Sequence, residues 1–305
     1  MQYGDAGVVT VSQDVPRPAA GAGKVLVEVR AASLNPVDSS IRMGYMHQMV
    51  PLHFPVTLGT DIAGVVAEVE GGAGGFAPGD RVFGTASVVA GGSGAFAEYA
   101  AVPAGSLARA PAGVSFAEAA ALPLAGVSAL QAIETLKLST GSRIFIQGGS
   151  GGIGSIAIQI AKKTGARVIA ACRGSAAAYV ESLGADQVID FEKTALPGGV
   201  RDCDAVLDTA GGAAYQASFA VLKKGGTIIT LAARPDAELA SKYGVTALGQ
   251  MTDVNTARLE RLAELVAAGS VKVHVDRTFP LSEVKEAFLA REAGRVKGKI
   301  VLRIG

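Results

Sequence analysis

Hydrophobic and polar residues alternate in short runs over the first third of the chain. Lys24–Arg30 (KVLVEVR) and Asp61–Glu70 (DIAGVVAEVE) place apolar side chains at about every second position, and Asp80–Phe83 is a shorter run of the same kind. A period of two is typical of strands that bury one face. Turn residues such as Gly71–Gly75 separate these runs. Short strands divided by turns favour a β-barrel or sandwich in this part of the chain.

The pattern changes near residue 115. Ser115 and Glu118 have the spacing of a helix capping box, ahead of the alanine-rich stretch Ala117–Leu122. Apolar runs of strand length then alternate with stretches of helical period. The strands are expected at Arg143–Gln147, Arg167–Ala171, Gln187–Ile189, Ala205–Leu207 and Thr227–Leu231, and the helices at Ser128–Leu136, Gly154–Thr164, Ala176–Leu183, Tyr215–Leu222 and Ala257–Ala268. This order predicts a parallel sheet with helices on both faces.

The chain therefore divides into two domains, which a length of 305 residues allows. Residues 1–118 and 269–305 are expected to form the β-rich domain, because the tail returns to a strand–helix–strand pattern that ends in Lys299–Arg303. Residues 119–268 are expected to form a doubly wound α/β domain inserted into it.

Composition excludes several functional classes. With 49% hydrophobic and 18% charged residues, the chain is not of the disordered kind. A net charge of +1 gives no reason to expect nucleic acid or an anionic membrane as partner. We found no uninterrupted apolar run of membrane-spanning length and no signal pattern, so the expected location is cytoplasmic. Two cysteines and three histidines, none at metal-ligand spacing, predict no bound metal.

Glycine is the compositional outlier, with 40 residues. One cluster, Gly149-Ser150-Gly151-Gly152-Ile153-Gly154, fits GxGxxG between a buried strand and a helix. In that setting Gly149 would permit the tight turn, Gly151 would let a pyrophosphate approach the backbone, and Gly154 would let the helix pack on the strand. The helix N-terminus would then bind the anion. The pattern predicts a dinucleotide site.

The residues after the second strand of this domain favour NADP(H) over NAD(H). An acidic residue usually stands there to bind the ribose 2′-hydroxyl, but this chain has Arg173 and Ser175. A guanidinium and a hydroxyl suit a 2′-phosphate. Arg173 could instead be a solvated loop residue.

Several further motifs occur in order along the chain. They are Asn35–Asp38 (NPVD), Ile41–Gly44 (IRMG), Leu58–Val66 (LGTDIAGVV), Phe76–Phe83 (FAPGDRVF), Leu122–Ala129 (LPLAGVSA), Leu183–Asp186 (LGAD), Val206–Gly212 (VLDTAGG) and Gly298–Leu302 (GKIVL). With these, the sequence resembles the medium-chain dehydrogenase/reductase superfamily over essentially its whole length, in particular the zinc-independent quinone oxidoreductase-like branch. The resemblance implies an α/β protein with a GroES-like partial β-barrel catalytic domain and a Rossmann domain.

The resemblance also implies a mechanism without zinc. Zinc-dependent relatives carry a cysteine in the segment that reads Asn35–Asp38 here, and a histidine where this chain has Thr60. The implied activity is hydride transfer from NADPH to a small apolar quinone or α,β-unsaturated carbonyl, in a homodimer that pairs through the strand around Val245–Met251.

The family pattern assigns roles to particular residues. Asn35 is implied on the catalytic side, and Tyr45 is either an acid or an aromatic wall of an apolar substrate pocket formed by the loop 43–54. The amides of Gly152 and Ile153 would meet the pyrophosphate. Lys299 is either a cofactor contact or a surface charge. The remaining implied cofactor contacts are Ser128, Thr209, Ala210, Gly211, Leu231, Ala232 and Ala233.

Two other functions stay open from the sequence. An enoyl-thioester reductase would need an acid and space for a pantetheine arm. A non-catalytic NADPH-binding protein with a structural or regulatory role would need only the dinucleotide site.

Overall fold

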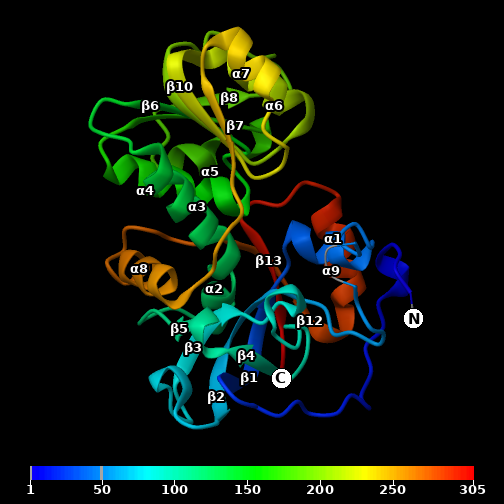
Figure 1. The fold of residues 1–305 in the computed structure, drawn as a ribbon. Coiled ribbons are helices and arrows are strands. Elements are labelled where there is room, and N and C mark those ends of the chain that lie inside the picture. Colours follow the sequence, from blue (N-terminus) through cyan, green and yellow to red (C-terminus); the bar gives the residue numbers. More distant parts are fainter. Residues whose placement is uncertain (1, 49–50) are drawn as a thin grey trace. The chain divides into compact units, whose positions relative to one another are not determined.

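The protein divides into two compact units in a computed structural model that describes residues 2–48 and 51–305 (Figure 1). The first unit comprises Met1–Leu124, Val254–Ala268 and Val273–Gly305, and the second comprises Ala125–Asp253 and Gly269–Lys272. One element lies in a different unit from that expected: helix α8 (Thr256–Ala267) belongs to the first unit and not to the α/β domain.

The first unit contains a mixed sheet of seven strands. They are β1 (Lys24–Ser33), β2 (Asp61–Val69), β3 (Arg81–Thr85), β4 (Tyr99–Pro103), β5 (Leu107–Arg109), β12 (Val275–Pro280) and β13 (Lys299–Arg303). The order is β12-β13-β1-β2-β3-β5, and β4 also pairs with β1. Strand β1 pairs with β4 through Lys24–Glu28 and with β13 through Ala31–Ser33. Irregularities in its pairing with β2 bend it between those partners, so the expected partial barrel is confirmed.

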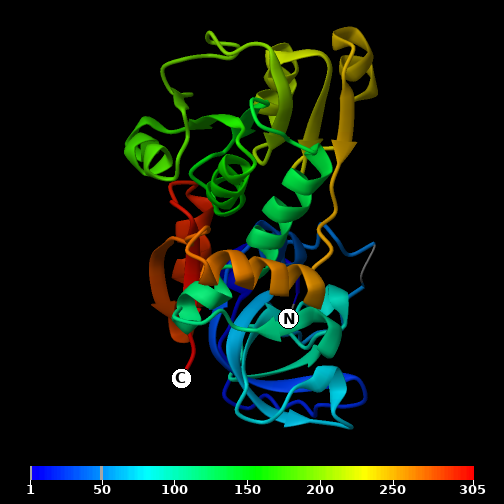
Figure 2. The same cartoon turned by 90° about the vertical axis from the view of Figure 1, so that its left-hand side faces the viewer.

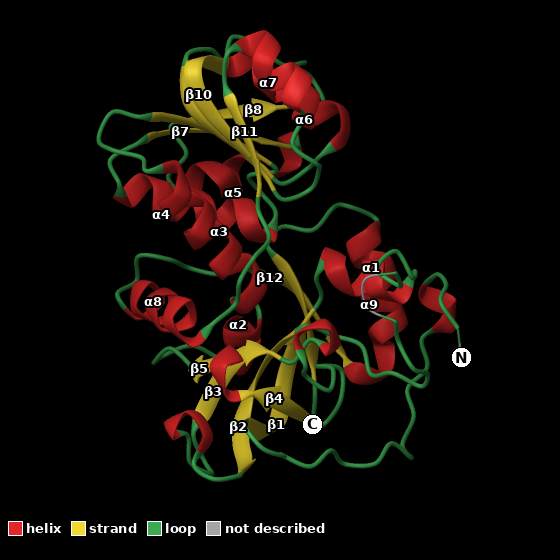
Figure 3. Ribbon diagram, viewed as in Figure 1, coloured by secondary structure: helices red, strands yellow, loops and turns green. Residues whose placement is uncertain are grey.

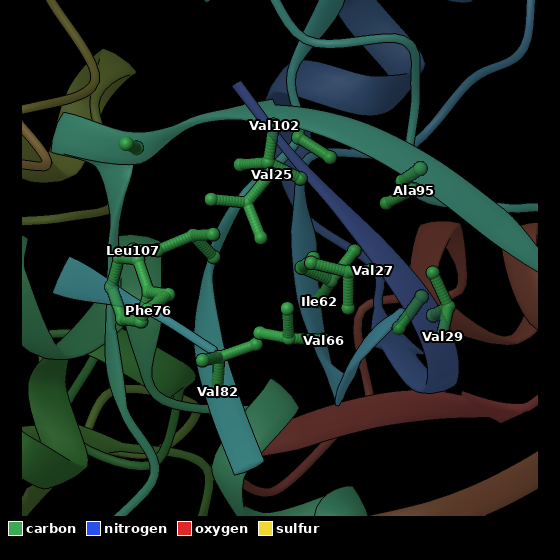
Figure 4. Close-up of a cluster of buried hydrophobic side chains, with 14 of the residues drawn as sticks. Val25, Val27, Val29, Ile62, Val66, Phe76, Val82, Ala95, Val102 and Leu107 are labelled. Carbon is green, nitrogen blue, oxygen red and sulfur yellow. The ribbon is translucent and has the colours of Figure 1, made fainter. Parts of the chain in front are cut away.

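The alternation of apolar residues in β1 accounts for the core of this sheet. Val25, Val27 and Val29 point into one cluster, where side chains of neighbouring strands such as Ile62 and Val102 meet them (Figure 4). Because strand side chains alternate between faces, a shift of one residue would remove all three valines from the core. The pattern therefore sets the register as well as the strand.

Four α-helices accompany this sheet within the described residues: α1 (Pro36–Arg42), α2 (Phe116–Ala120), α8 and α9 (Val284–Glu292). The predicted capping box is present at α2, where the Ser115 hydroxyl accepts from Glu118 N–H at 3.2 Å and Ser115 N–H donates to the Glu118 carboxylate at 2.8 Å. Helix α8 is held by the Thr256 hydroxyl, which donates to the Leu107 carbonyl at 2.8 Å. The buried leucines of α8 recur at helical spacing, so the sequence could predict the helix. The spacing did not indicate which of the two units the leucines pack against.

The second unit is built on a six-stranded parallel sheet. Its strands are β6 (Arg143–Gln147), β7 (Arg167–Cys172), β8 (Gln187–Asp190), β9 (Cys203–Asp208), β10 (Leu222–Thr230) and β11 (Thr246–Gly249), in the order β11-β10-β9-β6-β7-β8. The strand order reverses direction between β6 and β9, which is the doubly wound pattern that was predicted. Strand β11 is an edge strand, the outermost at the right in Figure 2.

Helices cover both faces of this sheet. Helices α4 (Gly152–Lys163) and α5 (Ala177–Ser182) lie on one face, and α6 (Gly212–Ser218) and α7 (Ala237–Tyr243) lie on the other (Figures 1 and 3). Helix α3 (Pro123–Leu136) leads into the sheet from the first unit. No helix in the described part of the chain combines the length and the apolar character needed to cross a membrane.

Candidate functional site

The glycine-rich turn joins β6 to α4. A Cβ on Gly154 would overlap the Gly148 carbonyl oxygen, which confirms that close packing at this position requires glycine. Gly148 is the residue of this turn with a left-handed backbone, with φ +79°, and Gly149 does not have a positive φ. Gly149 is restricted for another reason, since a Cβ there would lie 2.9 Å from the Ala170 Cβ of β7. The turn therefore brings α4 close to the sheet edge.

The N-terminus of α4 fits an anionic ligand. Its N-cap residue is Gly151, and no side chain caps it. The first backbone N–H groups of a helix have no intrahelical carbonyl partner, and here these are the amides of Gly152, Ile153 and Gly154. A Cβ on Gly151 would meet only the Gly148 oxygen, at 3.4 Å, so the backbone is open at this point. Open amides and a positive helix end suit the pyrophosphate of a dinucleotide.

One buried carboxylate shapes the two loops next to this turn. Asp208, the last residue of β9, is fully buried, and its Oδ1 accepts from the amides of Ala210 and Gly211 at 3.1 and 3.0 Å. Its Oδ2 accepts from the Thr230 hydroxyl at 2.7 Å. The Thr230 oxygen in turn accepts from the amides of Ala232 and Ala233, at 3.2 and 3.0 Å.

The predicted nicotinamide loops are thereby brought together at the carboxyl edge of the sheet. The Thr209 hydroxyl donates to the Gln147 carbonyl at 2.7 Å, and a Cβ on Gly148 would overlap that hydroxyl. A Cβ on Gly211 would lie 2.9 Å from the Ala232 carbonyl oxygen. Ser150, Thr209, Ala210, Gly211, Leu231, Ala232 and Ala233 thus belong to one edge of the sheet around the glycine turn.

Sequence reasoning missed Asp208 and Thr230 as the residues that hold these loops. Both are the last residues of buried strands, where a polar side chain enters the carboxyl edge of the sheet. A polar residue at the last position of a buried strand is the sequence signal that could have identified them. Ser128, a predicted cofactor contact, is buried and pairs with the Thr252 hydroxyl at 2.6 Å.

Arg173 and Ser175 follow β7 at the same edge. Ser175 is exposed. The Arg173 guanidinium donates to the Glu192 carboxylate at 2.7 Å and lies 5.4 Å from the centre of the Phe191 ring. Glu192 is a residue that sequence reasoning did not consider.

In the first unit, Asn35 is the centre of a buried polar network. Its side-chain amide donates to Asp61 Oδ2 at 2.8 Å, and its Oδ1 accepts from the Lys299 ammonium. Lys299 also donates to the Leu34 carbonyl at 2.9 Å and lies 3.8 Å from Asp61 Oδ2. The Asn35 backbone N–H donates to Asp38 at 2.7 Å, and the hydroxyl of Thr60 donates to the same carboxylate at 2.6 Å.

Burial changes the acidity of this network. Removal from water raises the pKa of the Asp38 carboxyl to about 7, although hydrogen bonds from Thr60 and Asn35 oppose the rise. The pKa of Asp61 is raised by burial, against the attraction of the Lys299 charge. The pKa of Lys299 is lowered by burial, against the attraction of both carboxylates. At each of these three groups burial disfavours the charged form, and the protein partners oppose that effect.

These contacts show how far each of the predicted residues of the first unit is buried and what it is bonded to. Lys299 is neither a surface charge nor a free cation, because its ammonium is buried and has three protein partners. Asn35 is 2% exposed. Tyr45, by contrast, is 78% exposed, and no hydrogen bond found among the described residues joins it to Asn35. Residues 49 and 50 of the predicted pocket loop lie outside the described residues; Met46, His47 and Leu52 line a shallow hollow with Tyr3 and Ile41.

Two members of this network lie where the family resemblance implies zinc ligands in zinc-dependent relatives. Asn35 donates to Asp61 there, and Thr60 donates to Asp38. Over residues 2–48 and 51–305, no three His, Cys, Asp or Glu side chains come together in a group that could hold a metal ion.

Comparison with known proteins gives two family matches. The alcohol dehydrogenase GroES-like domain matches residues 21–112, and a family described as zinc-binding dehydrogenase matches residues 183–302. The match to the zinc-binding dehydrogenase family does not include Asn35 or Thr60, the two residues discussed above at the implied zinc-ligand positions.

Individual relatives match nearly the whole chain. It is 33% identical to the mitochondrial NAD(P)H oxidoreductase RTN4IP1 of Mus musculus, over 99% of this chain and 87% of that protein. It is 35% identical to the 2-methylene-furan-3-one reductase of Solanum lycopersicum, over 98% of this chain and 76% of that protein. The structure of the quinone oxidoreductase from Coxiella burnetii superposes with a TM-score of 0.92 at 31% identity, over 100% of this chain and 97% of the other.

Proposed function

Because the chain belongs to the NAD(P)H-dependent, quinone oxidoreductase-like branch of the medium-chain dehydrogenase/reductase superfamily, we propose that it reduces a quinone or an α,β-unsaturated carbonyl with NADPH and without a metal. The observation that carries this proposal is the cradle at the carboxyl edge of the parallel sheet. The open amides of α4 and the two loops held by Asp208 lie side by side there. This is the edge at which doubly wound sheets bind ligands.

Each part of the cradle has a definite task in this proposal. The amides of Gly152 and Ile153 bind the pyrophosphate, and the loops 209–211 and 231–233 orient the nicotinamide end. Arg173 and Ser175 bind the 2′-phosphate, which supports NADPH in place of NADH. When bound, the cofactor supplies the hydride. Asp208 acts indirectly, by holding both loops in place.

The polar network around Asn35 supports the choice of substrate class. Its ammonium, amide and carboxylate groups bond to one another, and the chain has no cysteine or histidine at the positions of the family's zinc ligands. An acceptor that is electrophilic without a Lewis acid suits such a site, and quinones and conjugated carbonyls are of this kind. The name 2-methylene-furan-3-one reductase describes reduction of a conjugated ketone by a relative. Asn35 and Tyr45 remain the proposed catalytic-side residues, Tyr45 as an acid or a substrate wall.

NADPH-oxidation kinetics over a panel of quinones, enones and enoyl thioesters test this function. We expect turnover with the first two classes and the same rate after treatment with a chelator, with no stoichiometric zinc by elemental analysis. Preference for the thioesters would support an enoyl-thioester reductase. Tight NADPH binding with no turnover on any acceptor would support a non-catalytic role, and loss of activity with a chelator would reject the metal-free mechanism.

We further propose that the protein is a homodimer paired through β11. This short strand is an edge of the sheet, and unpaired strand edges favour association with a second strand. Sedimentation at micromolar concentration tests it, and a monomer throughout that range would reject it.

A further inference from the structure

The charged residues after β7 and β8 form a small cluster at the carboxyl edge of the second unit. Cys172 pairs with Asp190 in the parallel ladder, so the residues that follow these two strands emerge side by side. Phe191 N–H donates to the Cys172 carbonyl at 3.2 Å, which carries the pairing one residue further. Arg173 thus meets Phe191 and Glu192 because of strand register.

Glu192 is positioned by one hydrogen bond from its backbone and one to its side chain. Its N–H donates to Asp190 Oδ1 at 3.1 Å, and its carboxylate accepts from Arg173 at 2.7 Å. Asp190 has a second partner in Lys193, at 3.5 Å. The Asp190 carboxylate also borders Gly174, where a Cβ would overlap it.

The charges of this cluster cancel. Arg173 and Lys193 contribute two positive charges, and Asp190 and Glu192 contribute two negative charges. A cluster of this kind presents no excess positive charge to a phosphate dianion. The guanidinium that is expected to bind the 2′-phosphate is already paired with a carboxylate.

The Arg173–Glu192 pair is accessible and exchangeable. The side chains are 41% and 48% exposed, and exposed ion pairs contribute little net free energy. A phosphate can therefore displace Glu192 from Arg173, but it must do so next to a like charge. An uncharged 2′-hydroxyl experiences no such competition.

We propose that Glu192 is a specificity-determining residue that competes with the 2′-phosphate of NADPH for Arg173 and so limits the preference of the protein for NADPH over NADH. This inference rests on the proposed function, because it assumes that Arg173 binds the 2′-phosphate. It also predicts that the preference is smaller than Arg173 alone would produce.

The test compares the dissociation constants of NADPH and NADH, by fluorescence titration of the full chain at low ionic strength. For Glu192→Gln we expect NADPH to bind about 2- to 5-fold more tightly and NADH to bind as in the parent protein. Glu192→Ala should give the same result. In the Arg173→Ala background, Glu192→Gln should have little further effect on NADPH.

Glu68→Gln is the matched control. Glu68 forms an exposed ion pair with Arg17 in the first unit, also at 2.7 Å. Both variants replace Glu by Gln in an exposed pair with Arg, so the change in net charge is the same. It should leave both dissociation constants unchanged, and high salt should reduce the difference between the parent protein and Glu192→Gln.

The outcomes separate this inference from the proposed function. If the parent protein binds neither dinucleotide, the proposed function fails, and this inference fails with it. If NADPH binds and Arg173→Ala weakens it, but Glu192→Gln leaves the ratio unchanged or weakens NADPH, only the inference is overturned. If Arg173→Ala leaves NADPH binding unchanged, Glu192 has no phosphate to compete with at Arg173, and the inference is wrong.

Discussion

The charged groups around Asn35 and those around Arg173 use the same chemistry in different surroundings. Asp38, Asp61 and Lys299 are buried in the first unit, where burial disfavours the charged form of each and protein partners favour it. Arg173 and Glu192 are about half exposed in the second unit, so water can solvate either one when it loses its partner. Burial makes the first set part of the fold, while exposure leaves the second set able to exchange a partner for a ligand. The following experiments test this contrast.

The largest effect is expected for Lys299→Met. The change removes the ammonium and leaves the Asp61 carboxylate and the Asn35 carbonyl oxygen buried without their cation. Breaking a buried ion pair costs about 3–5 kcal/mol, and we expect a loss of unfolding free energy of that size in urea denaturation. Lys193→Met is the control, because that side chain is 82% exposed, and it should change stability by less than about 0.5 kcal/mol. Equal effects of the two variants would contradict the contrast.

A smaller effect, which depends on pH, is expected for Asp38→Asn. Since the folded-state pKa of Asp38 is raised from 3.8 to about 7, the folded protein binds more protons than the unfolded chain between these values. The contribution of Asp38 to stability is therefore complete below pH 4 and is lost as the pH rises towards 7. Asn at this position does not titrate.

Thermal or urea unfolding of both proteins from pH 5 to pH 8 measures this loss. The parent protein should lose about 3 kcal/mol relative to Asp38→Asn over that range. Asp14→Asn, at an exposed position in the same unit, should follow the parent protein. A constant difference between the parent protein and Asp38→Asn would contradict the raised pKa of Asp38.

The smallest effect on the fold, with a clear effect on binding, is expected for Arg173→Ala. Loss of a charge-assisted contact should weaken NADPH about tenfold or more, whereas NADH should bind as before. Because the Arg173–Glu192 pair is exposed, unfolding free energy should change by less than about 0.5 kcal/mol. A large loss of stability would show that Arg173 contributes to the fold as Asp38, Asp61 and Lys299 do, and would contradict the contrast.

The fold could be predicted from sequence because its signals are local. The period-two run Lys24–Arg30 specifies a strand, although Leu26 on its other face is buried as well, and the Ser115–Glu118 spacing specifies a helix start. Helix α8 shows the limit of this reasoning. Its leucine period predicts an amphipathic helix, but such a face can cover either unit, and only contacts such as Thr256 to Leu107 decide between them.

For the candidate site, the sequence by itself determined the glycine turn and the basic residue after β7, because both follow from residue type at a given position in a strand–turn–helix unit. It did not determine what their neighbours are. Asp208 and Thr230 are 22 residues apart in the chain, Lys299 and Asn35 are 264 apart, and Arg173 meets Glu192 only through the pairing of β7 with β8. Sheet register and burial brought these groups together, and they decided that Lys299 lies inside the first unit while Arg173 remains accessible. Burial depends on the whole packed chain, so the role of each charge was decided by the tertiary structure.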